Sequence, residues 1–269
     1  MSVSTPLGLI AGNGMLPYRI IENLNKSERA VFALGISGEV ADEVSGNIDA
    51  WVGIGQLQLA RDLMQQAGVR QVVIVGGVQR PNLTTLELDE GGVWVVERAL
   101  SQNQRGDSAL LTHVLDYFET QGFAIVSAAD LLSQDTPLSG LLTKAEMEPH
   151  QQDMARAVEI AGHIGALDIG QAAVVARGIV LGVESVEGTD AMLARVGDLS
   201  EEVRGTPDAR AGVLAKIPKP QQDRRIDLPA LGPHTIEGAA HSGLAGIVFE
   251  ADGVLFEAPK ASIKLANRA

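Results

Sequence analysis

Short apolar runs alternate with stretches of helical periodicity in the first half of the chain. The strand-like runs are residues 7–11, 30–34, 51–54, 71–75 and 123–126. Residues 18–24, 57–66 and 109–120 instead place apolar side chains at helical spacing. Strands that alternate with helices are typical of a parallel sheet with helices on both faces. The pattern therefore predicts an α/β fold, with a first, parallel-sheet domain over residues 1–132.

Residues 133–150 interrupt this pattern with prolines, serines and acidic side chains, as is typical of a linker. Beyond them, the pattern predicts a helix and then a β-hairpin that turns at Arg177-Gly178. A helix that opens at residues 187–190, a strand over 212–217, a helix capped by Thr235 and two late strands follow. We therefore predict a C-terminal mixed α/β domain over residues 151–269.

The Gly12-Asn13-Gly14 turn follows the first predicted strand, where parallel sheets commonly bind nucleotide phosphates. In the dinucleotide fingerprint G-x-G-x-x-G, the third glycine would stand at the position of Pro17. The second predicted strand also ends without an acidic residue to bind a ribose. The turn therefore favours a phosphate or uridine site over NAD. A turn that serves only close packing and, less favoured, a Rossmann-type oxidoreductase are the alternatives.

Carboxylates and lysines gather in two short segments of the second half. Glu187 and Asp190 stand three residues apart at a predicted helix start, and residues 216–232 combine lysines, arginines and aspartates with prolines that stiffen the backbone. Carboxylates with few histidines suit an oxygen-preferring cation such as Mg²⁺. The cations that could neutralise a pyrophosphate are Lys216, Lys219, Arg224 and Arg225. This set suits metal-assisted attack at phosphorus. Helix capping by the two acids and a solvated loop at 216–232 are the alternatives.

Composition and motifs exclude other chemistry. The chain has no cysteine, which excludes disulfides, thiolate catalysis and cysteine-ligated metals. It contains no H-E-x-x-H, P-loop or G-x-S-x-G motif. A net charge of −13 argues against nucleic-acid binding. No signal peptide is visible, and no apolar run approaches the roughly 20 residues of a membrane span, so we expect a soluble, cytoplasmic protein.

A series of short motifs runs along the whole chain. They lie at residues 8–14, 16–17, 76–77, 80–81, 106–107, 167–172, 183–190, 192–193, 212–216, 219–220, 225–229 and 243–247. Together and in this order they resemble the LpxI family of UDP-2,3-diacylglucosamine pyrophosphatases. The resemblance implies hydrolysis of a pyrophosphate bond to UMP and 2,3-diacylglucosamine 1-phosphate (lipid X), in lipid A biosynthesis. It also implies a Rossmann-like nucleotide-binding domain over residues 1–132, a family-specific catalytic domain over residues 151–269, and Mg²⁺ or another divalent cation as cofactor.

The same resemblance implies roles for particular residues. Asp227, Asp190 and Lys216 are the expected catalytic residues, and Asp227 is preferred over Asp223. The expected metal-binding carboxylates are Asp190, Glu187 and Asp227. Substrate-lining candidates are Gly12, Asn13, Gly14, Gly76, Gly77, Gln171, Thr189 and Met192. Ser108 departs from the family, which often has a second acid there.

The implied partner is a lipid-linked UDP-sugar, reached by peripheral contact with the inner membrane, while a homo-oligomer stays open. Its two acyl chains would need an apolar cavity, which we expect at the domain interface, where ligand sites often lie. A non-catalytic sugar-nucleotide or lipid-binding protein is the alternative, since the same residues would serve it without turnover.

Overall fold

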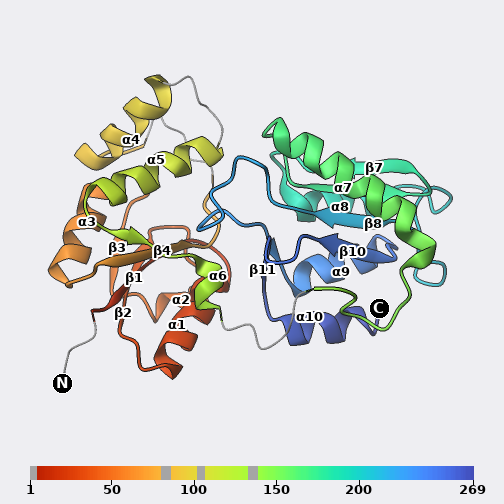
Figure 1. Cartoon of the computed structure of the whole chain (residues 1–269), viewed down its shortest axis with the longest axis horizontal. Helices are drawn as coiled ribbons and strands as arrows, with labels where there is room; N and C mark the ends of the chain where they lie inside the picture. The colour runs from red at the N-terminus through yellow and green to blue at the C-terminus, as the bar shows by residue number, and fades with distance from the viewer. Residues whose placement is uncertain (1–4, 80–85, 102–106, 133–138) are drawn as a thin grey trace. The chain divides into compact units, whose positions relative to one another are not determined.

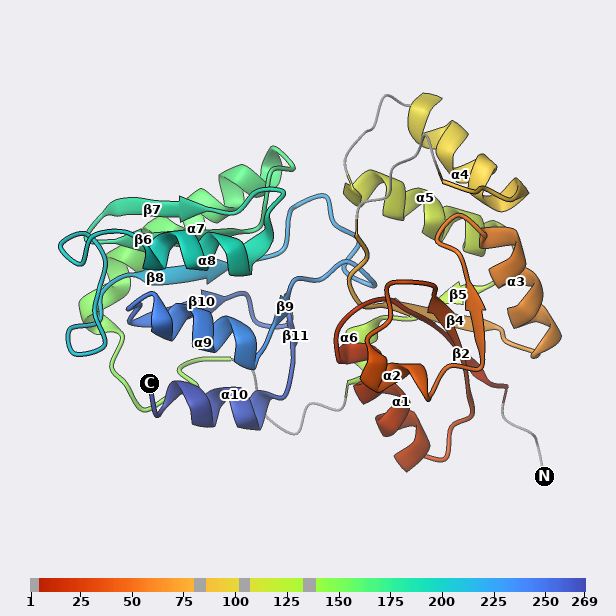
Figure 2. The same ribbon diagram turned by 180° about the vertical axis from the view of Figure 1, so that it is seen from behind.

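The computed structural model describes residues 5–79, 86–101, 107–132 and 139–269 (Figures 1 and 2). The chain folds as two units, Met1–Ser133 and Gln134–Ala269, called here the first and the second unit. Each unit combines helices with its own sheet. The α/β fold class predicted from the sequence is therefore confirmed.

The first unit is a parallel sheet with helices on both faces. Its elements are β1 (Leu7–Ala11), α1 (Leu16–Lys26), β2 (Val31–Ile36), α2 (Asp42–Ser45), β3 (Ala50–Val52), α3 (Leu57–Gln66), β4 (Gln71–Val75), α4 (Glu90–Ser101), α5 (Asp107–Thr120), β5 (Ala124–Ile125) and α6 (Ala128–Leu131). Its described strands lie in the order β3-β2-β1-β4-β5, and each neighbouring pair is parallel. The chain leaves β1 toward one edge of the sheet and later returns to β4 on the other side of β1. The carboxyl ends of β1 and β4 thus mark the reversal in strand order, where such sheets bind ligands.

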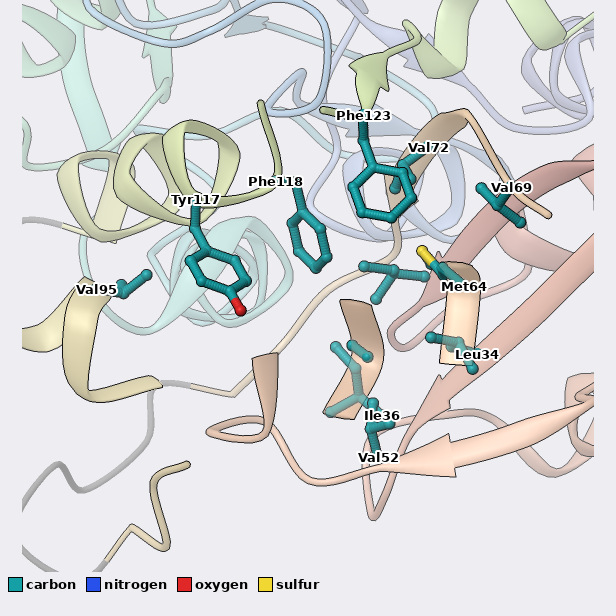
Figure 3. Packing of buried hydrophobic residues seen from close by; sticks show 12 residues of the cluster. Leu34, Ile36, Val52, Met64, Val69, Val72, Val95, Tyr117, Phe118 and Phe123 are labelled. Atoms are coloured by element: carbon teal, nitrogen blue, oxygen red, sulfur yellow. The ribbon is translucent and has the colours of Figure 1, made fainter. Parts of the chain in front are cut away.

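A buried cluster fixes α3 and α5 on one face of this sheet (Figure 3). It joins Leu34 of β2 and Val72 of β4 to Met64 of α3 and Phe118 of α5. The rings of Phe118 and Phe123 meet edge to face, with centroids 5.9 Å apart, an arrangement that aromatic pairs prefer. Helix α1 lies on the opposite face (Figure 1). Packing on both faces holds the carboxyl ends of β1 and β4 in place.

The second unit has a smaller mixed sheet. Its elements are the 3₁₀ turn η1 (Glu148–His150), α7 (Gln151–Ala166), β6 (Ala172–Ala176), β7 (Ile179–Val183), α8 (Gly188–Gly197), β8 (Val213–Lys216), β9 (Ala230–Leu231), α9 (Pro233–His241), β10 (Gly246–Phe249), β11 (Leu255–Phe256) and α10 (Pro259–Ala266). The described strands of this sheet lie in the order β10-β8-β6-β7. Strands β8 and β10 are parallel, whereas β6 is antiparallel to both of its neighbours. Strands β9 and β11 form a separate parallel pair.

The two faces of this sheet pack against different helices, because side chains alternate between the faces along each strand. Ala173 and Ala215 belong to the cluster that includes α7, whereas Val174 and Leu214 belong to the cluster of α8 and α9. Figure 2 shows α8 and α9 in front of the sheet and α7 behind it. Because side chains along a strand alternate between faces, Lys216 shares the face of Leu214, two residues before it. The lysine therefore points toward the layer of α8 and α9.

The hairpin of β6 and β7 forms as predicted. Arg177 and Gly178, at its turn, have φ of 52° and 77°, which matches the left-handed pair of a type I′ turn. The backbone N–H groups of both residues donate to the carboxylate of Asp153 in α7, at 2.9 and 2.8 Å. A buried acid on α7 thus satisfies the turn and ties the hairpin to that helix.

Two predictions from the sequence concern the linker at the start of this unit and the cap of a helix near its end. Of the predicted linker, residues 133–138 lie outside the described residues, while 139–150 pack within the second unit, with Leu142 against the cluster of Leu231 and Phe256. The predicted cap at Thr235 is wrong. Helix α9 begins at Pro233 and has Gly232 at its N-cap, so Thr235 lies buried inside the first turn.

Candidate functional site

The two glycine turns of the first unit meet at the carboxyl ends of β1 and β4. The Asn13 N–H donates to the Gly77 carbonyl at 2.6 Å, and the Gly77 N–H donates back to the Asn13 carbonyl at 3.0 Å. A Cβ on Gly12 would lie 2.9 Å from the Gly76 carbonyl oxygen, so the backbones approach too closely for a side chain. Gly14 and Gly76 have φ of 91° and 101°, where glycine is favoured. The structure thus brings together five of the predicted substrate-lining residues.

This junction has the features of an anion site. Helix α1 starts at Leu16, directly after the turn, with Pro17 in its first turn and no side-chain cap from Met15. The first amide groups of a helix have no partner within it and carry partial positive charge. A glycine turn followed by an uncapped helix start is a common cradle for phosphate. The turn therefore suits the phosphate or ribose side of a nucleotide.

In the second unit, a buried lysine is surrounded by acidic groups. Lys216 ends β8 and is only 7% exposed. Burial lowers the pKa of its ammonium group, because the charged form loses hydration. Three carboxylates oppose this shift, in decreasing order Glu184, Asp190 and Glu257. Of the predicted catalytic residues, Asp190 and Lys216 are thus close enough to interact.

Glu184 organises this cluster, although no role is expected for it from the sequence. It is 6% exposed, and its carboxylate accepts the Gln171 N–H at 2.9 Å and the Thr189 hydroxyl at 2.6 Å. It therefore links the start of β6 to the first turn of α8, beside Lys216. Two predicted substrate residues, Gln171 and Thr189, are held in place by it. The only sequence signal is an acid that ends a strand directly before the residue 187–190 motif.

Glu187 and Met192 occupy other surroundings. Glu187 stands at the N-cap of α8, but its carboxylate makes no capping bond and instead accepts Arg195 at 2.6 Å. Its pKa is lowered, first by its own backbone N–H and then by Arg195. Met192 is fully buried in the core between α8 and the sheet. Asp190, one turn into α8, is exposed.

Residues 216–232 are anchored at several points rather than forming a free surface loop. Lys219 pairs with Asp168 at 2.7 Å, and the Gln222 side chain donates to that of Gln171 at 3.2 Å. Asp223 accepts the Arg225 guanidinium at 2.7 Å, and this hydrogen bond lowers the pKa of Asp223.

Asp227 is half-buried one turn further on in this segment. Its backbone N–H donates to the Asp223 carbonyl at 2.9 Å. Asp223 thus has a structural partner in Arg225, and the preference for Asp227 as the catalytic residue stays a prediction.

The acidic side chains of the predicted metal site suit a cation that takes most of its ligands from phosphate groups and water. Within residues 5–79, 86–101, 107–132 and 139–269, no three His, Asp or Glu side chains group as metal ligands. Glu187 is engaged by Arg195, whereas Asp190 is exposed and near Lys216. Mg²⁺ often uses only one or two protein carboxylates and completes its shell with phosphates and water. The donor chemistry fits that mode, and the three-residue metal set stays a prediction.

Some expectations fall outside what the structure describes. Arg80, Pro81 and Gly106 of the sequence motifs lie outside the described residues, and the side chain of Ser108 is likewise not described. No helix among the described residues has the length and apolar character needed to cross a bilayer.

Comparison with known proteins covers both units. The models of the LpxI N-terminal and C-terminal domains match residues 6–134 and 138–269. A protein of Caulobacter vibrioides named UDP-2,3-diacylglucosamine pyrophosphatase LpxI is 42% identical over 262 residues. That match covers 97% of this chain and 94% of the relative. The matches to both units therefore agree with the sequence motifs and with the observed fold, and the chain belongs to the LpxI family.

Proposed function

We propose that this protein hydrolyses the pyrophosphate bond of UDP-2,3-diacylglucosamine to release UMP and 2,3-diacylglucosamine 1-phosphate. The observation that carries the proposal is the 42% identity, over almost the whole of both chains, to a relative whose name states this substrate. The glycine junction of the first unit and the buried lysine of the second suit nucleotide and phosphate groups. Because the substrate is a lipid, the protein meets it at the inner surface of the membrane.

Lys216 supplies positive charge where the reaction concentrates negative charge. A cation in a desolvated site interacts more strongly with phosphate oxygens than one on the surface. Its position at the end of β8 is fixed by pairing with β6 and β10. Glu184 is a positioning residue, because it holds Gln171 and Thr189 around the lysine.

Asp227 is the carboxylate proposed to act on water, and Asp190 is proposed to act on the phosphate side. Attack of water on one phosphorus forms a new P–O bond and breaks the bridging P–O bond, and a carboxylate accepts the proton that water loses. Asp227 takes this role, and Asp190 helps to orient the phosphates. A divalent cation, which Asp190, Glu187 and Asp227 would hold, would neutralise phosphate charge when bound.

The direct test is release of UMP from UDP-2,3-diacylglucosamine by the purified protein, measured by chromatography with Mg²⁺ and with EDTA. We expect turnover with Mg²⁺ and loss of turnover with EDTA, restored by excess Mg²⁺. Release that EDTA does not affect would overturn the metal requirement. Binding of the substrate without UMP release would favour a non-catalytic binding protein.

Asp227→Ala tests the catalytic assignment. We expect kcat to fall by roughly 10²–10⁴-fold, the usual contribution of a positioned acid or base. Asp223→Asn is the matched control in the same segment, since its partner is Arg225. It should retain kcat within a few-fold. Equal losses in both variants would mean that residues 216–232 act only through their fold, and circular dichroism would verify that both variants are folded.

A further inference from the structure

The turn that follows β2 carries a carboxylate that reaches across the end of the neighbouring strand. Glu39 is the third residue after β2, and its side chain accepts the backbone N–H of Gln79, in the loop after β4, at 3.0 Å. Strands β2 and β4 pair with β1 on opposite sides, so a bond between the loops that follow them crosses the carboxyl end of β1. The carboxylate of Glu39 therefore lies beside the glycine junction of residues 12–14 and 76–77.

A tight turn holds Glu39 in this place and leaves part of its carboxylate available. The Glu39 N–H donates to the carbonyl of Ile36, the last residue of β2, at 3.0 Å, and Gly38 has a φ of 82°. The side chain of Glu39 is half-buried. Its bond to Gln79 uses the oxygen Oε2, and within the described part of the chain Oε1 has no hydrogen-bond partner. One acceptor thus remains for a ligand.

A carboxylate at this junction favours one part of a nucleotide over the others. It repels phosphate, whose charge has the same sign, but it accepts hydrogen bonds from hydroxyl groups. In sheets of this type, the phosphates lie at the start of the first helix, and an acid beyond the second strand binds a ribose hydroxyl. Glu39 takes the place of that acid. It does not end the strand itself but follows a turn, so the strand pattern of the sequence does not reveal it.

The loops of the junction also present apolar side chains. Met15 follows Gly14 and is 39% exposed, and Val78 follows Gly77 and is 41% exposed. Exposed apolar groups beside a polar anchor suit the uncharged part of a nucleoside, because contact removes their surface from water. The junction thus combines an acceptor for hydroxyl groups with apolar surface for the base or the sugar.

We propose that Glu39 binds the ribose of the nucleotide and makes the site selective for ribose over 2′-deoxyribose. The proposal rests on the proposed function, because the ribose is that of the UMP part of the substrate. The 2′-hydroxyl donates to the carboxylate of Glu39, and the uncapped start of α1 remains for the adjoining phosphate. A nucleotide without this hydroxyl loses a hydrogen bond to a charged group, which lowers its affinity by roughly tenfold at a half-buried site.

The test compares UMP with dUMP, its 2′-deoxy analogue, by calorimetric titration of the purified protein. We expect the parent to bind UMP about tenfold more tightly than dUMP, and Glu39→Ala to bind the two within about threefold of each other. Glu43→Ala is the matched control, since it removes the same charge from an exposed position on α2. It should keep the ratio of the parent.

The ratio between the two ligands separates a contact with ribose from a purely structural role. If Glu39 only ties the two loops together, Glu39→Ala weakens both ligands equally and leaves the ratio unchanged, which would overturn the proposal. Glu39→Gln keeps an acceptor for the Gln79 N–H without the charge, so its ratio should fall between those of the parent and Glu39→Ala. A parent that binds UMP and dUMP equally, or binds neither, would also overturn it.

These titrations do not depend on turnover. Selective UMP binding that requires Glu39, in a protein that releases no UMP from UDP-2,3-diacylglucosamine, would retain the ribose site and reject the proposed hydrolysis. Release of UMP by a protein that does not discriminate between UMP and dUMP would reject the ribose site and retain the hydrolysis.

Discussion

At the scale of single residues, the environment of Lys216 decides over which pH range it carries charge. Burial disfavours the ammonium form and lowers its pKa, and the neighbouring carboxylates, Glu184 first, favour it. The lysine thus loses its proton at a lower pH than an exposed lysine would. A positive charge that must meet phosphate is useful only below that pKa.

Lys216→Arg tests this dependence on pH. A protonated lysine is present below its pKa, so activity should be lost as the pH rises through the lowered pKa of Lys216. Arginine stays charged over the accessible range, so the variant should lack this alkaline decline, even at a lower maximum rate. The measurement is kcat/KM against pH, which reports groups of the free enzyme. An alkaline decline shared by both proteins would assign it to another group.

Residue types and spacings in the sequence indicate the phosphate chemistry, but not the partners of each side chain. Asp190 and Lys216 are expected together and do interact. Glu184 has no expected role, because its importance comes from bonds to Gln171 and Thr189 that bring distant segments together. Burial of this kind arises only when β6, β7 and α8 pack. A short motif cannot show it.

At the scale of elements, the junction of β1 and β4 depends on glycine for two separate reasons. Gly76 has a left-handed backbone, and a Cβ there would lie 2.7 Å from backbone atoms of Asn13 and Gly12. The N–H groups of Gly12, Asn13, Gly14 and Gly77 all donate to partners within this junction. Free amides for a ligand would therefore come from the uncapped start of α1, directly after the turn.

Comparing Gly76→Ala with Gly68→Ala separates the cost of steric collisions from the cost of a left-handed backbone. Gly68 also has a positive φ, 77°, yet a Cβ there would meet nothing within 4 Å. Gly68→Ala should cost only the conformational strain, about 1–2 kcal/mol in the free energy of unfolding. Gly76→Ala adds backbone collisions and should cost at least about 1 kcal/mol more, with weaker UMP binding. Urea unfolding and calorimetric titration with UMP measure the two effects, and equal costs for the two variants would show that the junction relaxes freely.

Periodicity predicts most strands and helices, and its failures have local causes. Helix α4 is missed because Gly91 and Gly92 stand in its first turn, where glycine disfavours a helix. In the fold these glycines let α4 approach the start of α3, since a Cβ on Gly91 would lie 2.6 Å from the backbone nitrogen of Gln58. Close packing thus outweighs helix propensity.

At the scale of the whole molecule, the net charge of −13 opposes approach to an anionic membrane. Electrostatic repulsion between the protein and acidic lipids extends over about 30 Å at 0.01 M salt and about 8 Å at 0.15 M. The proposed lipid substrate would therefore be reached against a long-range electrostatic barrier that salt weakens. Short-range apolar contact then has to supply the attraction.

Vesicle assays should reveal this barrier. With substrate in acidic phospholipid vesicles, we expect the rate of UMP release to rise a few-fold as salt increases from about 0.01 M to about 0.15 M. With zwitterionic vesicles as the control, the rate should change little. A rate that falls with salt on acidic vesicles would mean that a local cationic surface docks the protein, despite its net charge.

The two-part α/β organisation is predictable because each half has its own hydrophobic pattern. The second unit has a cavity of about 410 Å³ among residues 139–148, strand β10 and helices α9 and α10. This cavity is not predictable from the sequence, because residues 139–148, which form one of its walls, are predicted as part of a linker. Chain segments far apart in sequence enclose it, and only their packing leaves it open. The acyl site expected at the domain interface stays a prediction.

In strand β8, which carries Lys216, the number of residues matters as much as their identity for the side of the sheet that each side chain faces. Neighbouring side chains on β8 face opposite layers, so losing or gaining one residue within Val213–Lys216 would exchange the lysine with Ala215. A charge would then enter the apolar layer under α7, and the acidic cluster would lose its cation. Residues 217–229 lie outside any strand, so a change in their number would not turn Lys216 to the other face of the sheet. Natural variation in length should therefore be absent from β8.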